Sequence, residues 1–299
     1  MQTRKGILLA GGEGCRLHPA TTGVNKHLLP VWDRPLVYYP LATLIRLGVT
    51  EILVVTTEHE RRSFETLLGH GARWGVCFSY ESQAEALGAA HALGLAEDWL
   101  NGAPCVLAMG DNIFLGERLP ELLATADKRT EGATLFASRV DNPQNYGVVK
   151  LDQNGRPIGL EEKPARPSSP WAVTGLCFYD GRAATLARKL VPSGRGEFEI
   201  ADLHEAYLQE GALRILPLGA ATSWWDCGTF IQLHDAATAL RAREIETGLK
   251  YPTPEESALR AGHLSPQAWQ SLIERLPDGP YRRYLSLLPT SATEHSAVA

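Results

Sequence analysis

The first two thirds of the chain alternate continuous apolar runs with stretches of helical periodicity. The apolar runs that suit buried strands are residues 6–10, 51–56, 77–80, 104–109 and 133–139. The stretches between them that suit helices are residues 40–47, 60–68, 84–97 and 119–130. Strands that are apolar throughout belong in a sheet covered on both faces. The pattern therefore predicts an α/β fold with a Rossmann-like, mixed but mainly parallel sheet flanked by helices.

Beyond residue 145 the runs become shorter and turns separate them. Asn154-Gly155 lies between apolar runs at 148–151 and 157–160, which predicts a β-hairpin, and residues 172–179 suit a further strand. Helical patterns return at 230–247, 266–276 and 280–288. We therefore expect a core over residues 1–229, divided at about 145, then a helical section over 230–288. The small, polar tail 289–299 is expected to be disordered.

Composition narrows the class of protein without naming a function. The chain has 299 residues, 44% apolar and 21% charged, and a net charge of −5, which is typical of a globular protein with no overall attraction to nucleic acid or anionic lipid. The apolar run near the start is too short for a signal peptide or a membrane span. Five scattered cysteines without C-x-x-C spacing indicate reduced thiols rather than disulfides or a zinc site, so we expect a cytoplasmic protein.

The segment with the most candidate ligand-binding residues follows the first predicted strand. Gly11, Gly12 and Gly14 are followed by Arg16 and, ten residues later, by Lys26. Glycines let backbone N–H groups turn toward an anion, and two cations beside them suggest a polyphosphate. A dinucleotide fingerprint would need glycine where Leu17 stands, and the P-loop spacing is absent. A glycine-rich turn that binds nothing is the remaining alternative.

Ligands of such sheets bind outside the carboxyl ends of the strands. The glycine loop follows the strand at 6–10, and Asp111 follows the strand at 104–109. We therefore expect the loop and this carboxylate to share one edge of the sheet. A turn residue without a ligand is the alternative for Asp111.

The pattern G-G-x-G-x-R-L-x-P with K-x-L-L-P-V downstream resembles the signature loop of sugar-1-phosphate nucleotidylyltransferases. Within them the chain is most similar to the glucose-1-phosphate thymidylyltransferases, which open dTDP-deoxysugar synthesis. The resemblance continues in family order through PLVYYP, GDN, YGVV, EEKP, VTGL, RGEFEI and WWDCGT, to about residue 288.

This resemblance implies transfer of a nucleotidyl group from dTTP to a hexose 1-phosphate, with release of pyrophosphate. The sugar phosphate attacks the α-phosphorus in line, so catalysis consists mainly of positioning and of cations that offset negative charge. The implied catalytic residues are Arg16 for the leaving pyrophosphate, Lys26 for the triphosphate and Lys163 for the sugar phosphate. Asp111 and Asp226, which we expect to converge, are the implied ligands of Mg²⁺.

The implied nucleotide-binding residues are Leu9, Ala10, Gly11, Gly12, Glu13, Gly14, Cys15, Arg16, Lys26, Gln83, Gly88 and Asp111. Gln83 would read the imide edge of the base, to which an amide offers both a donor and an acceptor. The implied sugar-phosphate residues are Tyr146, Gly147, Glu162, Lys163, Val173, Arg195 and Trp224. The resemblance also implies a homotetramer that uses the helical section, and neither nucleic acid nor membrane as a partner.

Several positions depart from the usual family pattern. They are Cys15 for Thr, His27 for Gln, Ala86 for Pro, Ala89 for Leu, Cys177 for Tyr, Trp225 for Leu and Cys227 for Thr. The smaller Ala89 and Cys177 suggest extra room for the sugar. Use of UTP or of a different sugar 1-phosphate is therefore an alternative, and a non-catalytic nucleotide-binding protein is a more distant one. An NAD-dependent oxidoreductase is disfavoured by Leu17.

Overall fold

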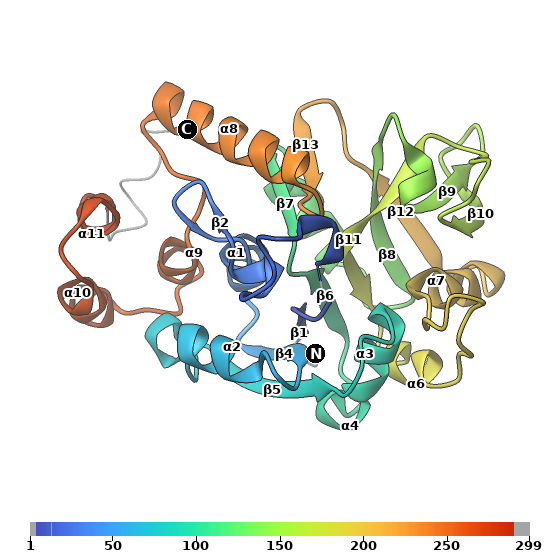
Figure 1. Ribbon diagram of the computed structural model, residues 1–299, viewed down its shortest axis with the longest axis horizontal. Coiled ribbons are helices and arrows are strands. Elements are labelled where there is room, and N and C mark those ends of the chain that lie inside the picture. The colour runs from blue at the N-terminus through green and yellow to red at the C-terminus, as the bar shows by residue number, and fades with distance from the viewer. Residues whose placement is uncertain (1–3, 13, 290–299) are drawn as a thin grey trace.

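The computed structural model describes residues 4–12 and 14–289, and its centre is a nine-stranded mixed sheet (Figure 1). Glu13 and residues 290–299 of the expected tail lie outside the described part. The sheet consists of β1 (Lys5–Leu9), β4 (Glu51–Thr57), β5 (Cys77–Gln83), β6 (Cys105–Met109), β8 (Ala133–Arg139), β9 (Gly147–Leu151), β10 (Pro157–Glu162), β11 (Trp171–Tyr179) and β12 (Leu213–Pro217).

The strands β5, β4, β1 and β6 lie side by side in this order and are parallel. The strand β11 pairs antiparallel with β6 on one side and with β8 on the other, and β12 runs parallel to β8. The predicted hairpin is confirmed: β9 and β10 pair antiparallel, and β9 joins β11 where Val148 faces Ala172. The mixed, mainly parallel α/β sheet is therefore the predicted one.

Helices cover both faces of the sheet because the strand residues alternate between two apolar clusters. Leu8 and Val54 belong to one cluster and Ile7 and Leu53 to the other. The first cluster is covered by α1 (Tyr38–Arg46), α2 (Arg61–Leu68), α5 (Leu119–Asp127), α9 (Pro254–Arg260), α10 (Pro266–Arg275) and α11 (Pro280–Ser286). The second is covered by α3 (Ala89–Leu95), α4 (Glu97–Leu100), α6 (Ala183–Ala187) and α7 (Ile200–Gln209).

The predicted helix over 84–97 is wrong at its start. The strand β5 continues to Gln83, residues 84–88 form a loop, and α3 begins only at Ala89. The loop ends at Gly88 with φ of +100°, and a Cβ there would lie 2.6 Å from the carbonyl oxygen of Phe198. This conformation is open to glycine and strained for other residues, so it prevents the helix from starting earlier.

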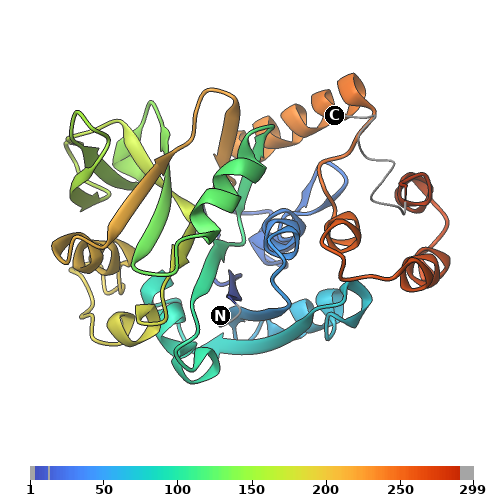
Figure 2. The same cartoon turned by 180° about the vertical axis from the view of Figure 1, so that it is seen from behind.

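The C-terminal helices lie at the opposite end of the molecule from the β9–β10 hairpin, as both views show (Figures 1 and 2). The long α8 (Phe230–Thr247) precedes them and packs against β2 (Pro30–Val31), which pairs with β3 (Arg34–Pro35). No helix in residues 4–12 and 14–289 is both long and apolar enough to cross a membrane.

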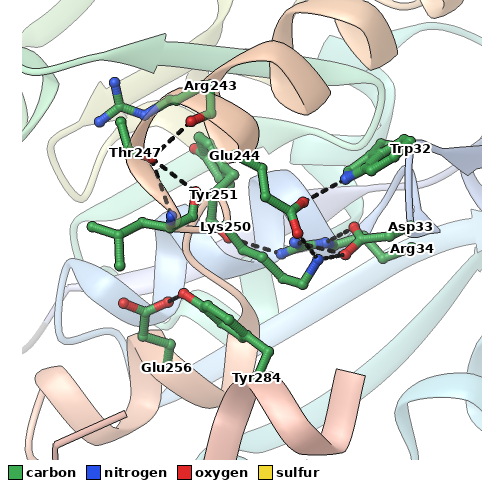
Figure 3. A network of polar contacts seen from close by, with 11 residues as sticks. Trp32, Asp33, Arg34, Arg243, Glu244, Thr247, Lys250, Tyr251, Glu256 and Tyr284 are labelled. Carbon is green, nitrogen blue, oxygen red and sulfur yellow. Dashed lines mark hydrogen bonds and ion pairs between the residues drawn. The ribbon is translucent and has the colours of Figure 1, made fainter. Parts of the chain in front are cut away.

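A polar network ties α8 to the β2–β3 turn (Figure 3). Glu244 accepts hydrogen bonds from Trp32 Nε1 and from Lys250 Nζ, each at 2.6 Å. The same Lys250 ammonium lies 2.8 Å from Asp33, whose other contact is Arg34 at 2.8 Å. Since the Lys250 side chain is only 9% exposed, these contacts compensate a nearly buried charge and hold the end of α8 in place.

Candidate active site

The glycine loop and Asp111 lie at the same edge of the sheet, as the parallel strands predict. Leu9 is paired with Met109 in the last register position of β1 and β6. Just beyond, the N–H of Gly110 donates to the carbonyl oxygen of Leu9 at 2.7 Å. The two strands therefore deliver the glycine loop and Asp111 together above their carboxyl ends.

Glycine is required at two positions of the loop. Gly12 has φ of +113° and Gly14 has φ of +63°, where it begins the short 3-10 helix Cys15–Leu17. A Cβ on Gly14 would lie 3.0 Å from the Thr21 methyl group and 3.2 Å from Lys26 Cβ. The glycines thus allow the Lys26 segment to pack closely against the loop.

Lys26 and Asp111 form a buried ion pair, with Nζ and Oδ2 2.5 Å apart. Burial alone would lower the pKa of Lys26, but the Asp111 charge outweighs it, so this pKa is raised. Burial likewise opposes ionisation of Asp111, yet the Lys26 ammonium holds the pKa of that carboxyl well below its usual range. Both groups are therefore charged at neutral pH.

A two-stranded sheet brings Asp226 to the same place. It consists of β7 (Asn112–Gly116) and β13 (Thr222–Asp226), and Asp226 is paired with Asn112, the neighbour of Asp111. The N–H of Cys227 also donates to the Asp111 carbonyl oxygen at 2.9 Å. Burial, and then the Asp111 charge, raise the pKa of Asp226 to about 6. The positive charges of Lys26, Arg16 and Lys163 only partly offset these two effects, so further positive charge nearby would favour ionised Asp226.

A divalent cation would supply that charge. Among the described residues no three carboxylate, His or Cys side chains gather to hold a metal. However, Mg²⁺ in nucleotide sites takes only one or two carboxylates and completes its shell with phosphate and water oxygens. The pair Asp111 and Asp226 fits that requirement. Arg16 is the next cation, with its guanidinium 4.0 Å from Asp226 and packed on Gly228, where a Cβ would lie 2.3 Å from it.

A cavity of about 860 Å³ extends from the glycine loop on the side of β5 and α3. It is lined by Leu9, Gly11, Gly12, Gly14, Cys15, Lys26, Gln83, Gly88 and Asp111 of the expected nucleotide-binding set. The expected residue Ala10 is buried, and its N–H donates to Val55 O at 2.7 Å, so it supports the loop from behind. Gln83 differs from expectation in one respect. Its NH₂ group faces Gly88 O at 3.3 Å and His91 Nδ1 at 2.8 Å.

A second cavity, of about 470 Å³, lies on the side of β9 and β11. It is lined by Tyr146, Gly147, Glu162, Lys163, Val173 and Trp224 of the expected sugar-phosphate set and by Asp226. Arg16, which was expected among the nucleotide-binding residues, also lines this cavity and not the larger one. The rings of Tyr146 and Trp224 pack with centroids 5.3 Å apart, and Gln232 donates to the Tyr146 hydroxyl at 2.9 Å. Met109, the last residue of β6, lines both cavities, which are therefore neighbours.

Glu162 lies between two cations. Its Oε1 is 3.5 Å from Lys163 Nζ and 3.3 Å from Arg195. Lys163 has φ of +42°, and its N–H donates to Tyr146 O at 3.0 Å, so the backbone turns here and carries the ammonium beside Glu162. Arg195 also binds Glu199 at 2.8 Å and lines the larger cavity rather than the smaller one.

The departures from the family pattern fall on both sides of the site. Ala89 and Ala86 line the larger cavity, so the volume that Ala89 leaves free lies there and not in the smaller cavity. Cys177 does line the smaller cavity. His27 is buried, its Nδ1 binds Asn25 Oδ1 at 2.7 Å, and burial lowers its pKa to about 3. It is therefore neutral.

Sequence reasoning missed the residue that joins the strands around the smaller cavity. The amide oxygen of Asn112 accepts from Trp224 Nε1 at 2.5 Å and from Gly175 N at 2.9 Å, and its NH₂ group donates to Asp111 at 2.9 Å. The only signal was its place in GDN. His204, bound to the Tyr179 hydroxyl at 2.7 Å, was also missed because it comes from α7 in the middle of a helix.

Comparison with known proteins identifies the family of the chain. The family model described as nucleotidyl transferase matches residues 5–243, so the chain belongs to the nucleotidyl transferase family.

Among curated relatives, glucose-1-phosphate thymidylyltransferase of Xanthomonas campestris pv. campestris is 44% identical over 99% of this chain and 100% of its own. The Mycolicibacterium smegmatis protein of the same name is 45% identical over 94% and 97%. A solved Bacillus anthracis structure, described as a glucose-1-phosphate thymidylyltransferase with sucrose, has a TM-score of 0.75 and 36% identity over 85% of this chain and 99% of its own.

Proposed function

We propose that this protein is an enzyme that transfers a thymidylyl group from dTTP to α-D-glucose 1-phosphate and releases pyrophosphate. The observation that carries the proposal is a pair of neighbouring cavities that share Met109 in their lining. Lys26 and Asp111 line the larger cavity, and Arg16 and Asp226 line the smaller one. A reaction between two phosphate compounds needs such a pair of sites and a charged group between them. Full-length relatives that are 44% identical carry the corresponding name.

The proposed roles follow from the two cavities. The larger cavity holds dTTP, with its phosphates on the glycine loop and Lys26, and the smaller one holds the sugar phosphate, with Lys163 at its phosphate and Glu162 at its hydroxyl groups. Asp111 and Asp226 would hold Mg²⁺, which neutralises phosphate charge when bound. Arg195 lies between Glu162 and the larger cavity, where it can contact either phosphate compound.

The chain's own groups perform most of the catalysis. A sugar phosphate is already an anionic nucleophile, so the site needs no strong general base. Lys26 is held in its charged form by Asp111 and draws the triphosphate toward the loop. Arg16 projects from the 3-10 helix after the glycines and stabilises the departing pyrophosphate.

The decisive experiment is a matrix of turnover with dTTP, UTP and other nucleoside triphosphates against several sugar 1-phosphates, followed by pyrophosphate release with Mg²⁺ and with EDTA. We expect the highest kcat/KM with dTTP and glucose 1-phosphate and loss of activity in EDTA. The second candidate is the same reaction with another sugar phosphate, because Cys177 stands in the wall of the smaller cavity. Preference for a substituted hexose would favour that candidate, and no turnover with any pair would contradict both.

Arg16→Ala tests the assignment of the leaving-group cation. We expect kcat to fall on the order of 10²-fold with little change in the KM for dTTP, since the guanidinium acts mainly on charge that develops in the transition state. Arg61→Ala is the matched control, because Arg61 pairs with Glu65 on the surface of α2. Near-normal turnover of Arg16→Ala would contradict the role.

Three broader proposals rest on the family resemblance. The chain is divided into a nucleotide-binding part to about residue 145, a sugar-phosphate part to about 229 and a helical section to 288. It forms a homotetramer in which the helical section contributes to subunit contacts, and it works in the cytoplasm. Analytical ultracentrifugation checks the assembly.

A further inference from the structure

The base-reading glutamine is held by neighbours that use both of its amide protons. Gln83 is 5% exposed at the end of β5 and lines the larger cavity. Its Nε2 lies 3.3 Å from the carbonyl oxygen of Gly88 and 2.8 Å from Nδ1 of His91. Because a carbonyl oxygen only accepts hydrogen bonds, the atom that faces Gly88 must be the NH₂ group.

This orientation fixes the state of His91. One proton of the Gln83 amide points to Gly88 O, so the other points to His91 Nδ1, which must accept it. Nδ1 of His91 therefore carries no proton in this hydrogen bond, and the N–H of the ring is at Nε2. The amide has no proton left for a ligand.

The carbonyl oxygen of the same amide faces the glycine loop. A Cβ on Gly11 would lie 3.3 Å from Gln83 Oε1, and Gly11 lines the cavity. Gln83 thus presents an acceptor to this cavity. Thymine and uracil carry a donor at N3, whereas N3 of neutral cytosine is an acceptor and would meet the Gln83 oxygen unfavourably.

His91 itself is held in position by packing. Its ring lies against Phe198, with centroids 5.5 Å apart and planes at 36°. The backbone of Phe198 is fixed to the loop around Gly88, because its N–H donates to Leu87 O at 2.8 Å and its carbonyl oxygen accepts from Ala90 N at 3.3 Å. The histidine therefore has limited freedom to turn away from Gln83.

We propose that His91 is a positioning residue for base selection: it holds the Gln83 amide so that its carbonyl oxygen alone meets the base, and the site therefore selects a base with an N–H donor at N3. This inference rests on the proposed function, since it assigns the larger cavity to a pyrimidine nucleotide. It also differs from the expectation that Gln83 offers both a donor and an acceptor.

The test compares wild type, His91→Leu and His91→Asn. Leucine removes the acceptor, whereas the Oδ1 atom of asparagine can take the place of Nδ1. We expect His91→Leu to lower kcat/KM for dTTP about ten-fold, the effect of one lost hydrogen bond, and to reduce the preference for dTTP over dCTP by a similar factor. His91→Asn should retain most of the kcat/KM for dTTP and most of the preference for dTTP over dCTP. The KM for glucose 1-phosphate should not change in either variant.

His234→Leu, on the exposed surface of α8, is the matched control. An unchanged dTTP to dCTP ratio in His91→Leu, or equal weakening of both nucleotides, would overturn the role of His91 while leaving the proposed function intact. Failure of wild type to use dTTP at all would instead contradict the proposed function.

A second measurement needs no variant. Calorimetric binding of dTTP and of N3-methylated dTTP to the wild-type protein compares a base with the N3 donor against one without it. At least about ten-fold weaker binding of the methylated nucleotide is expected. Equal binding would show that the Gln83 oxygen does not read N3 and would overturn the proposal even if His91→Leu failed to fold.

Discussion

Asp226 illustrates how a single side chain can favour function at the expense of stability. Its pKa of about 6 lies above the ordinary value of 3.8, so the folded protein binds a proton more tightly than the unfolded chain does. Between pH 4 and 6 the stability contributed by this carboxyl therefore decreases as pH rises, and the loss persists above pH 6.

We predict that Asp226→Asn raises the melting temperature of the metal-free protein at pH 7.5 by several degrees and abolishes most turnover. The amide removes the buried charge that repels Asp111, and it is a poorer ligand for a divalent cation. Thermal unfolding in EDTA measures the first effect. Near pH 4 the two proteins should melt together, and a destabilised variant at pH 7.5 would contradict the argument.

His27 has the opposite dependence on pH. Burial lowers its pKa from 6.5 to about 3, so between these pH values the histidine is protonated in the unfolded chain and unprotonated in the folded protein. Stability is complete above pH 6.5 and is lost progressively as pH falls toward 3.

We predict that His27→Gln reduces acid sensitivity, because glutamine does not titrate in this range. The wild-type free energy of unfolding should drop by about 2 kcal/mol more than that of the variant between pH 6.5 and pH 5. Urea titrations at both pH values check this. His204, also buried with a pKa of about 3, remains in both proteins and leaves a common background. Equal acid sensitivity would count against the burial argument.

At the scale of elements, the β7–β13 pair does more than any single helix to assemble the site. It carries Asp226 to Asp111 across 115 positions of sequence, and Asn112 fastens the pair to β11 through Gly175. The Asn112 oxygen also fixes the Trp224 ring in the wall of the smaller cavity.

We predict that Asn112→Ala raises the KM for glucose 1-phosphate about ten-fold and changes the KM for dTTP much less. The alanine frees the Trp224 indole and leaves the N–H of Gly175 without its acceptor. Steady-state kinetics with each substrate varied in turn separates the two effects. An equal rise in both KM values would indicate general damage to the site.

The elements also show how far sequence alone can reach. Continuous apolar runs predicted the strands β1, β4 and β6, because burial on both faces leaves that pattern. The pair β7–β13 was not predicted, since a turn was the alternative considered at Asp111 and nothing local reveals a partner so distant in sequence. The reversal at β11 was hidden for the same reason: an apolar strand does not record its direction.

In the candidate site, too, the residues within short motifs could be located from sequence, and those that act through distant contacts could not. The glycine loop, Lys26 and Asp111 could be located because short motifs at strand ends carry them. Asn112 and His91 act through hydrogen bonds to side chains that approach only in the fold. Arg195 was expected beside the sugar and lies against the larger cavity, a difference set by the loop before α7.

For the whole molecule, the C-terminal helices are part of the core rather than an attachment. Trp269, Leu272 and Ile273 of α10 belong to the same apolar cluster as Leu8 of the first strand. Each such side chain contributes about 2 kcal/mol when buried. Loss of these three side chains would therefore remove a free energy comparable to a large fraction of the total stability of an ordinary domain.

We therefore predict that a chain ending at residue 248 is insoluble or unfolded, although it retains every proposed site residue. Circular dichroism and near-ultraviolet spectra of the purified fragment test this. The truncation also removes Lys250, which neutralises Glu244 at the end of α8. A cooperatively folded fragment with full nucleotide affinity would show that the helices are dispensable.

The shared wall at Met109 limits how this protein can be redesigned. Because the Met109 side chain lines both proposed substrate cavities, shortening it to admit a bulkier sugar would also enlarge the proposed nucleotide cavity. Under the proposed assignment, remodelling of sugar choice should instead begin at Cys177 or His204, which line the smaller cavity and not the larger one. Changes there can widen the range of sugar phosphates accepted while nucleotide binding is retained.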